Sequence, residues 1–191
     1  MDITEESKHP VKLEDIQFSK FIVGSVARRV MALMTLGFIL AVPCAKAQTV
    51  ITMADTNFIL AAAQGGMTEV KLGELAATGG MRDDVKEFGQ MMVKDHTAIN
   101  DDLKTLAAQK GIALPHRLDA EHQGMVDRMA ALTGSRFDNA FLIVMIQVHE
   151  KDAKAFKAES AATQDADIKH FLDAATPIVQ SHLQQATALK K

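Results

Sequence analysis

Apolar residues recur at steps of three and four along four long stretches of the chain, with polar residues between them. This spacing is typical of amphipathic α-helices that turn one face toward a shared core. The predicted helices cover residues 52–77, 83–110 and 135–162, and the stretch that follows Asp165. No strand-like alternation of apolar and polar residues competes with this pattern, and no repeat of about 20–50 residues is evident.

Short polar motifs mark the predicted beginnings of these helices. Thr52 followed by Asp55 has the spacing of a capping box, with Asp in place of the usual Glu. Ser135 followed by Asp138 has the same spacing and predicts a second capping box. Asp165 stands where an N-cap of the last helix is expected.

The first predicted helix contains a pair of glycines, Gly65 and Gly66. Each costs about 1 kcal/mol of helix stability relative to Ala. Glycines inside a helix suit the close approach of another helix, so we expect a helix contact there. The buried side of this helix is predicted from the three- and four-residue steps as Phe58, Ala62, Gly65, Glu69, Leu72 and Ala76.

Two short connections flank a long one, which contains a shorter amphipathic segment at residues 118–132. Four helices of roughly 24–28 residues would each be about 36–42 Å long. This pattern predicts an all-α fold, a four-helix bundle made of two antiparallel hairpins. A short extra helix is expected in the long crossover between the hairpins.

Each long helix places one titratable residue on its apolar side, namely Glu69, His96, His149 and His182. In a bundle of two hairpins, a rise of about 1.5 Å per residue puts all four within about 8 Å of one level. A carboxylate and three imidazoles in a core form a workable site for a transition metal ion such as iron, manganese, copper or zinc. Nearby acidic residues that could join as ligands or as partners of the ligands are Asp95, Glu150, Asp152 and Asp173.

The same four residues also permit a structural interpretation without a metal ion. A buried histidine can donate to a backbone carbonyl, or pair with a buried glutamate, and bind nothing. Glu69 is the most informative of the four, because an unpaired buried carboxylate is costly. It needs a cation, a protonated histidine or a proton of its own.

The composition excludes several classes of function. The net charge is −3 and no basic stripe carries interleaved aromatic residues, which argues against nucleic acid as a partner. The single cysteine, Cys44, lies before the predicted cleavage point, so thiol catalysis, zinc–thiolate sites and iron–sulfur clusters are excluded from the mature protein. The methionines after Ala47 follow the helical spacing, which favours core filling over copper binding.

Residues 1–47 are interpreted as an N-terminal extension and a secretory signal. Two arginines, Arg28 and Arg29, precede an apolar run at 30–42, and an A-x-A site at 45–47 follows it. We expect cleavage after Ala47 and a bundle domain at 48–191 in the periplasm or cell envelope. An apolar run of about 13 residues is too short to cross a bilayer as a helix. Lipidation of Cys44 and twin-arginine export remain open alternatives, as does the true translation start.

Several stretches carry a family resemblance, and they are 55–58, 61–69, 92–96, His149 and 181–183. Here the chain resembles uncharacterised exported bacterial proteins named "predicted outer membrane protein", a domain of unknown function grouped with the ferritin-like fold. The resemblance covers residues 55–190 and implies a ferritin-like bundle in the cell envelope. Association with the outer membrane or another envelope protein is left open by the sequence. It implies no established activity. The Glu-x-x-His motif of di-iron members is missing, because Val93 and Val179 precede His96 and His182 by three residues.

Two hypotheses of function follow. In the first, the protein is a non-catalytic envelope bundle with a binding or stress-related role, and the four core residues form a structural network. In the second, it is a metal-binding protein or metal-dependent redox enzyme of ferritin-like type, with Glu69, His96, His149 and His182 as ligands. A bundle that binds a partner through an exposed apolar patch is a third alternative. No serine–histidine–aspartate arrangement, phosphate loop or dinucleotide fingerprint is present.

Overall fold

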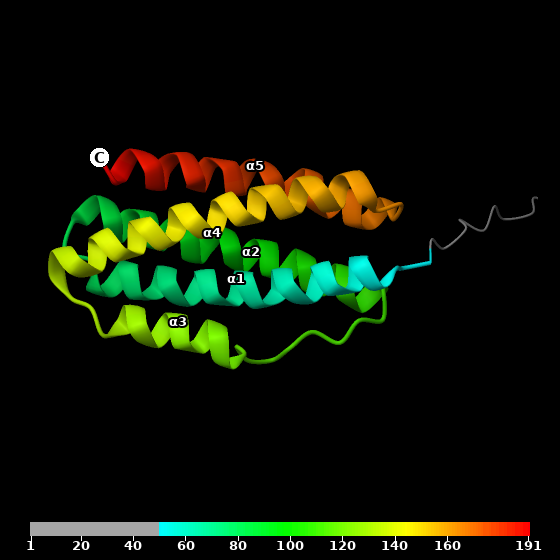
Figure 1. Ribbon diagram of the computed structural model, residues 1–191, viewed down its shortest axis with the longest axis horizontal. Helices are drawn as coiled ribbons and strands as arrows, with labels where there is room; N and C mark the ends of the chain where they lie inside the picture. The colour runs from blue at the N-terminus through cyan, green and yellow to red at the C-terminus, as the bar shows by residue number, and fades with distance from the viewer. Residues whose placement is uncertain (1–49) are drawn as a thin grey trace, which may run out of the picture. The chain divides into compact units, whose positions relative to one another are not determined.

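The computed structural model describes residues 50–191, and these residues form α-helices and no strand (Figure 1). The helices are α1 (Met53–Gly79), α2 (Asp83–Gln109), α3 (Ala120–Ala130), α4 (Gly134–Ala162) and α5 (Ala166–Leu189). Helices α1 and α2 form one antiparallel hairpin, and α4 and α5 form the other. The short helix α3 lies in the long connection between them, so the predicted bundle architecture is confirmed.

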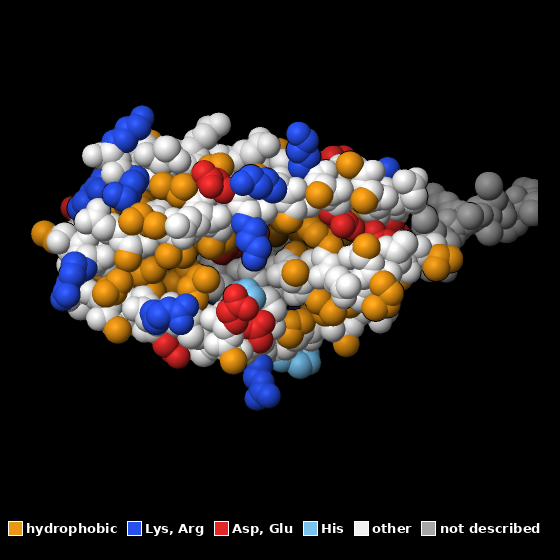
Figure 2. All heavy atoms as spheres, in the orientation of Figure 1, with side chains coloured by type: hydrophobic (Ala, Val, Ile, Leu, Met, Phe, Trp, Pro, Cys, Tyr) orange, Lys and Arg blue, Asp and Glu red, His pale blue; other side chains and the backbone are white. Residues whose placement is uncertain are grey.

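The two hairpins pack side by side. Helix α2 lies against α5, and α1 lies against α4, so the four long helices enclose a common core. Helices α1 and α5 run in one direction, and α2 and α4 run in the other (Figure 1). Helix α3 covers α1 and also touches α4. The surface over α1, between α3 and α4, is hollowed, with acidic, basic and histidine side chains around the hollow (Figure 2).

Two of the predicted helix caps are confirmed. The Thr52 hydroxyl accepts from the Asp55 N–H at 3.0 Å, and the Asp55 carboxylate accepts from the Thr52 N–H at 2.8 Å. This reciprocal arrangement satisfies two backbone donors that the first turn of α1 leaves free. Asp165 caps α5 by accepting from the N–H groups of the next turn.

The capping box predicted at Ser135 and Asp138 is wrong. Helix α4 begins after Thr133, which makes no side-chain cap. Asp138 is buried and accepts instead from the backbone N–H groups of Met81 and Arg82, each at 2.9 Å. Its carboxylate thereby satisfies two N–H groups in the turn that precedes α2. One buried acid therefore ties the second hairpin to the turn of the first.

The helix contact expected at the Gly65–Gly66 pair is observed at Gly66, which meets a side chain of α2, while a close approach of the α1 and α2 backbones lies at Gly73 and Gly89. A Cβ atom on Gly89 would lie 2.8 Å from the carbonyl oxygen of Gly73. A Cβ atom on Gly65 would meet nothing within 4 Å, whereas one on Gly66 would clash with the Asn100 side chain. The glycines that let the two backbones approach closely are therefore about two turns further along the hairpin.

The core consists of two apolar clusters. One contains residues toward the beginning of α1 and α5, including Ile59, Leu103 and Leu172. The other lies toward the opposite end of the bundle and includes Phe88 and Phe141. In each long helix, the titratable residue predicted for the core falls between the residues of the two clusters. A layer of polar side chains therefore divides the core.

None of the helices within residues 50–191 combines the length and apolar character needed to cross a membrane. The predicted leader, its cleavage point after Ala47 and Cys44 lie outside the residues that the structure describes.

Candidate metal centre

The four long helices bring Glu69, His96, His149 and His182 together in one layer, called the polar layer below. Each side chain comes from a different helix, and each residue is at most 3% exposed. The three imidazoles, called the histidine cluster below, have ring centroids 5.2–5.5 Å apart. The predicted convergence of the four residues at one level of the bundle is therefore observed.

The orientation of His149 is fixed by its own helix. Its Nδ1 lies 2.8 Å from the carbonyl oxygen of Met145, one turn earlier in α4. A carbonyl oxygen only accepts, so Nδ1 carries the proton and donates it. The other ring nitrogen, Nε2, then presents a lone pair. This buried atom has no hydrogen-bond partner.

The ring of His96 is held by Glu69 of the neighbouring helix. The Nδ1 atom of His96 lies 3.0 Å from Glu69 Oε2. A proton on Nδ1 would lie against the carboxylate and would leave Nε2 of His96 with its lone pair on the other side of the ring. The second carboxylate oxygen, Oε1, is buried without a hydrogen-bond partner and lies 3.6 Å from His149 Nε2.

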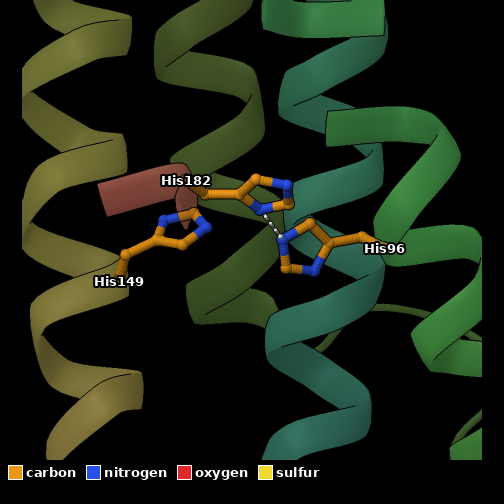
Figure 3. Close-up of side chains that lie close together, drawn as sticks. All are labelled: His96, His149 and His182. Atoms are coloured by element: carbon orange, nitrogen blue, oxygen red, sulfur yellow. Dashed lines mark hydrogen bonds between the residues drawn. The ribbon is translucent and has the colours of Figure 1, made fainter. Parts of the chain in front are cut away.

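The ring of His182 is held by Asp95 of α2. Its Nε2 atom donates to Asp95 Oδ2 over 3.0 Å. The Nδ1 atom then faces His96 Nε2 at 3.2 Å, as the dashed line in Figure 3 shows. If the outer nitrogen of each ring carries the proton, the two facing nitrogens both present lone pairs, whereas a proton on His96 Nε2 would make this contact a hydrogen bond. Two facing lone pairs repel each other unless a proton or a metal cation lies between them.

The outer nitrogen of each imidazole is thus directed at an oxygen, and the inner nitrogens converge (Figure 3). One ligand nitrogen from each ring can be chosen so that all three lie within 4.8 Å of one another. Two nitrogens bound to one tetrahedral ion at about 2.0 Å would be roughly 3.3 Å apart. The 3.2 Å separation of the His96 and His182 nitrogens is close to this value. An outer N–H donated to a carboxylate or carbonyl is also the usual arrangement of a metal-binding histidine.

The lowered pKa values of the three imidazoles favour their neutral form. Burial lowers the pKa of His96 to about 4. Burial also lowers the pKa values of His149 and His182. A neutral ring offers a lone pair to a cation without first losing a proton.

The carboxyl groups near the cluster behave in the opposite way. Burial raises the pKa of Glu69 to about 7. Burial and the neighbouring charge of Glu69 raise the pKa of Asp152 to about 7 as well. At neutral pH a proton is therefore available between these two acids.

The structure separates the acidic neighbours that the sequence indicated. Asp95 and Asp152 lie beside the polar layer, next to His182 and Glu69 respectively. Glu150 and Asp173 are exposed and line a surface groove between α4 and α5 instead. Glu69 belongs to the polar layer, but the group of residues whose ligand atoms could share one metal ion consists of the three histidines and does not include it.

Sequence reasoning overlooked Asn100. Its Oδ1 atom is buried without a hydrogen-bond partner. The residue lines a cavity of about 30 Å³ together with Glu69, His96 and Asp152. Asn100 follows His96 by four residues, so the helical period would have placed the two on one face of α2.

The fold and the site define a class: an all-α bundle with a buried layer of three histidines and one glutamate. The chain belongs to the DUF4142 family, a domain of unknown function, whose model matches residues 40–189. This confirms the predicted membership of an uncharacterised domain family. Among curated proteins, none matches the sequence.

Two solved structures have a similar fold. The crystal structure of a DUF305 fragment from Deinococcus radiodurans superposes with a TM-score of 0.65 at 11% identity, over 74% of this chain and 98% of that one. CopM in the Cu(I)-bound form superposes with a TM-score of 0.59 at 15% identity, over 70% of this chain and 93% of that one. At these identities the similarity shows a shared helical-bundle fold.

Proposed function

We propose that this protein is a non-catalytic metal-binding bundle that holds a copper ion on His96, His149 and His182. The observation that carries the proposal is the direction of the three rings. Each outer nitrogen is directed at an oxygen atom, and each inner nitrogen points into the cluster. This is the arrangement that three metal-binding imidazoles require.

A purely structural network explains these contacts less well. It leaves His149 Nε2 and Glu69 Oε1 buried without partners. An unsatisfied buried polar atom costs about 1–3 kcal/mol. It also needs a proton between the two nitrogens of His96 and His182 that face each other at 3.2 Å. A bound cation would take the place of that proton and would give the orphaned His149 nitrogen a partner.

The donor set favours copper among the first-row metals. Three imidazole nitrogens suit copper and zinc, whereas manganese prefers oxygen ligands. The centre is buried and surrounded by neutral rings, so a monovalent cation such as Cu(I) requires less compensation than a divalent one. Buried thioethers stand one turn before two of the ligands, at Met92 and Met145. The similar fold of CopM, which was solved with Cu(I), is compatible with the same choice.

A binding role is favoured over catalysis because the centre has no room for a substrate. The three histidines are at most 2% exposed. The cavity that touches His96 and Glu69 has a volume of about 30 Å³, enough for one or two water molecules. The predicted leader supports a location in the periplasm or cell envelope. We propose no nucleic-acid partner, and association with the outer membrane remains a prediction.

Titration of the metal-free protein with Cu(I), against a coloured competing chelator, tests the proposal. We expect one equivalent to bind and to raise the melting temperature, because a ligand at about 100 times its Kd stabilises the folded state by about 2.7 kcal/mol. His149→Ala should abolish the binding. The matched control is His170→Ala, since His170 is an exposed histidine of α5.

Three outcomes would contradict the proposal. Metal-free protein whose melting is unchanged by Cu(I), Cu(II) or Zn(II) would show that the polar layer is structural. Binding of zinc without copper would show that the choice of metal is wrong. Equal copper binding by His149→Ala and His170→Ala would place the ion elsewhere.

A further inference from the structure

The histidine cluster is enclosed by the four helices, so an ion needs a way to reach it. Two hollows lie between solvent and the cluster. A groove of about 450 Å³ runs along α1 and α4 beside the start of α3, on the hollowed face in Figure 2. The cavity of about 30 Å³ lies deeper, against Glu69 and His96. The two hollows share the lining residues Ala62, Gly65, Asp152 and Phe156.

Groups that can bind a cation line first the groove and then the inner cavity. The groove is lined at α3 by Asp119, Glu121 and His122. Asp152 borders both hollows, and its carboxyl lies beside Glu69. In the inner cavity, Glu69 Oε1 is buried and lacks a hydrogen-bond partner. Lys151 also lines the groove, so the cation-binding groups share it with one basic side chain. An ion moving inward would meet the carboxyl groups of Asp152 and Glu69 before it meets the nitrogens of the histidine cluster.

One of the residues that line both hollows, Gly65, has no side chain. A Cβ atom built on Gly65 would meet nothing within 4 Å. The next residue, Gly66, has the Asn100 side chain packed against it and leaves no such space. Any larger residue at position 65 would therefore extend into open space at the boundary of groove and cavity.

We propose that metal ions enter through the groove between α1 and α4, past Gly65 and Asp152, and reach the histidine cluster by way of Glu69. The inference rests on the proposed metal binding and adds the route. Gly65 keeps the passage open because it has no side chain. Asp152 offers the carboxylate that an incoming cation meets at the inner wall.

The rate of loading tests the route separately from binding. Cu(I) is supplied as its complex with a coloured chelator, and transfer to the metal-free protein is followed by stopped-flow absorbance. Gly65→Leu should load more slowly than the unchanged protein, on the order of tenfold, and still bind one equivalent at equilibrium. Gly65→Ala should slow loading less than Gly65→Leu does. Asp152→Asn should also slow loading, although Gly65 is unchanged in that variant.

The matched control is Gly79→Leu, at a second glycine of α1 whose added Cβ would meet nothing within 4 Å. Leu is a better helix former than Gly, so neither variant should unfold α1. Equal loading rates for Gly65→Leu and Gly79→Leu would overturn the route and place the entrance elsewhere, such as beside the partly exposed Asp95. Absence of copper at equilibrium in the unchanged protein would overturn the proposed function, and the route with it.

Discussion

Asp95 and His182 are joined across the contact of α2 and α5 by a hydrogen bond of 3.0 Å between Nε2 and Oδ2. Asp95 immediately precedes His96 in the chain, so adjacent residues of α2 supply one imidazole of the cluster and the partner that orients another. The carboxylate occupies the outer N–H of His182 and thereby turns Nδ1 toward His96. The orientation of the cluster therefore depends on a residue outside it.

Replacing Asp95 should weaken metal binding without removing a ligand. Loss of such a supporting partner typically reduces metal affinity about 10–100-fold. We expect Asp95→Ala to show this loss in competition titrations with Cu(I). Asp102→Ala, at an exposed aspartate of the same helix, should bind like the unchanged protein. An Asp95→Ala affinity equal to that of the control would show that the hydrogen bond has no role in binding.

The buried acids should make the metal-free protein less stable as the pH rises. The pKa of Asp152 is raised from 3.8 to about 7, and that of Glu69 from 4.5 to about 7. Between the ordinary pKa values near 4 and the raised values near 7, the folded state holds more protons than the unfolded state. The contribution of these two acids to stability therefore falls as the pH rises from about 4 to 7. Asp152→Asn removes one of these acids. Its melting temperature relative to the unchanged protein should therefore be higher at pH 8 than at pH 5.

Thermal unfolding of the metal-free proteins at several pH values checks this expectation. Asp173→Asn, at an exposed position of α5, is the control and should follow the unchanged protein at every pH. A constant difference between Asp152→Asn and the unchanged protein would show that Asp152 does not titrate in this range.

The bound ion should be retained in mildly acidic solution. Burial lowers the pKa of His96 to about 4 and lowers those of His149 and His182. Protons therefore compete with the metal for these rings only well below the pH at which an exposed imidazole titrates. We expect the apparent affinity for Cu(I) to change little from about pH 8 to pH 6 and to fall steeply toward pH 4. A loss centred near pH 6.5 would indicate exposed ligands.

Asp138 should be essential for joining the two hairpins. Its buried carboxylate accepts two backbone hydrogen bonds at 2.9 Å from the turn before α2. Since hydrogen bonds to charged groups are among the strongest in proteins, Asp138→Ala should lower the free energy of unfolding by about 2–4 kcal/mol in urea denaturation. The control is Asn139→Ala, at the exposed neighbouring residue, which should change the free energy of unfolding by no more than about 0.5 kcal/mol.

Two glycine substitutions should have opposite effects on stability. A Cβ atom on Gly89 would lie 2.6 Å from the backbone nitrogen of Ala77, so Gly89→Ala forces α1 and α2 apart. Overpacking of this kind typically costs about 1–3 kcal/mol. Gly65→Ala meets open space and should stabilise the protein by up to about 1 kcal/mol through helix propensity. Urea denaturation of both variants measures the difference, and effects of the same sign would contradict the packing described above.

Much of the bundle was predictable because helical periodicity and helix rise are regular. The same regularity located the four residues of the polar layer, since the heights of Glu69, His96, His149 and His182 depend only on residue counts and helix direction. Whether those residues bind a metal is a question of side-chain direction. The hydrogen bonds from His149 to Met145 and from His182 to Asp95 set that direction, and no spacing rule encodes them.

The errors arose where the sequence signal is weak. In the first half of α1, Ile59, Ala63 and Gly66 are buried, whereas the predicted Phe58, Ala62 and Gly65 are only partly buried. Phe58 and Ala62 still pack against the core from its edge. Alanine and glycine occupy both sides of this segment, so a shift of one residue changes the apolar content of the buried face very little. Asp138 was misassigned for a different reason. Its spacing from Ser135 suits a cap, but a turn more than 50 residues earlier in the chain offers its carboxylate two backbone donors.

The division of the histidine cluster between the two hairpins has a consequence for biogenesis. The first hairpin contributes His96 alone, while His149 and His182 arrive with the second. A growing chain that has released only α1 and α2 presents a single imidazole of the three, too few to retain an ion against competing cellular ligands. The metal site would therefore be filled only after the last helix has docked, so a protein that carries the ion would be a fully folded one.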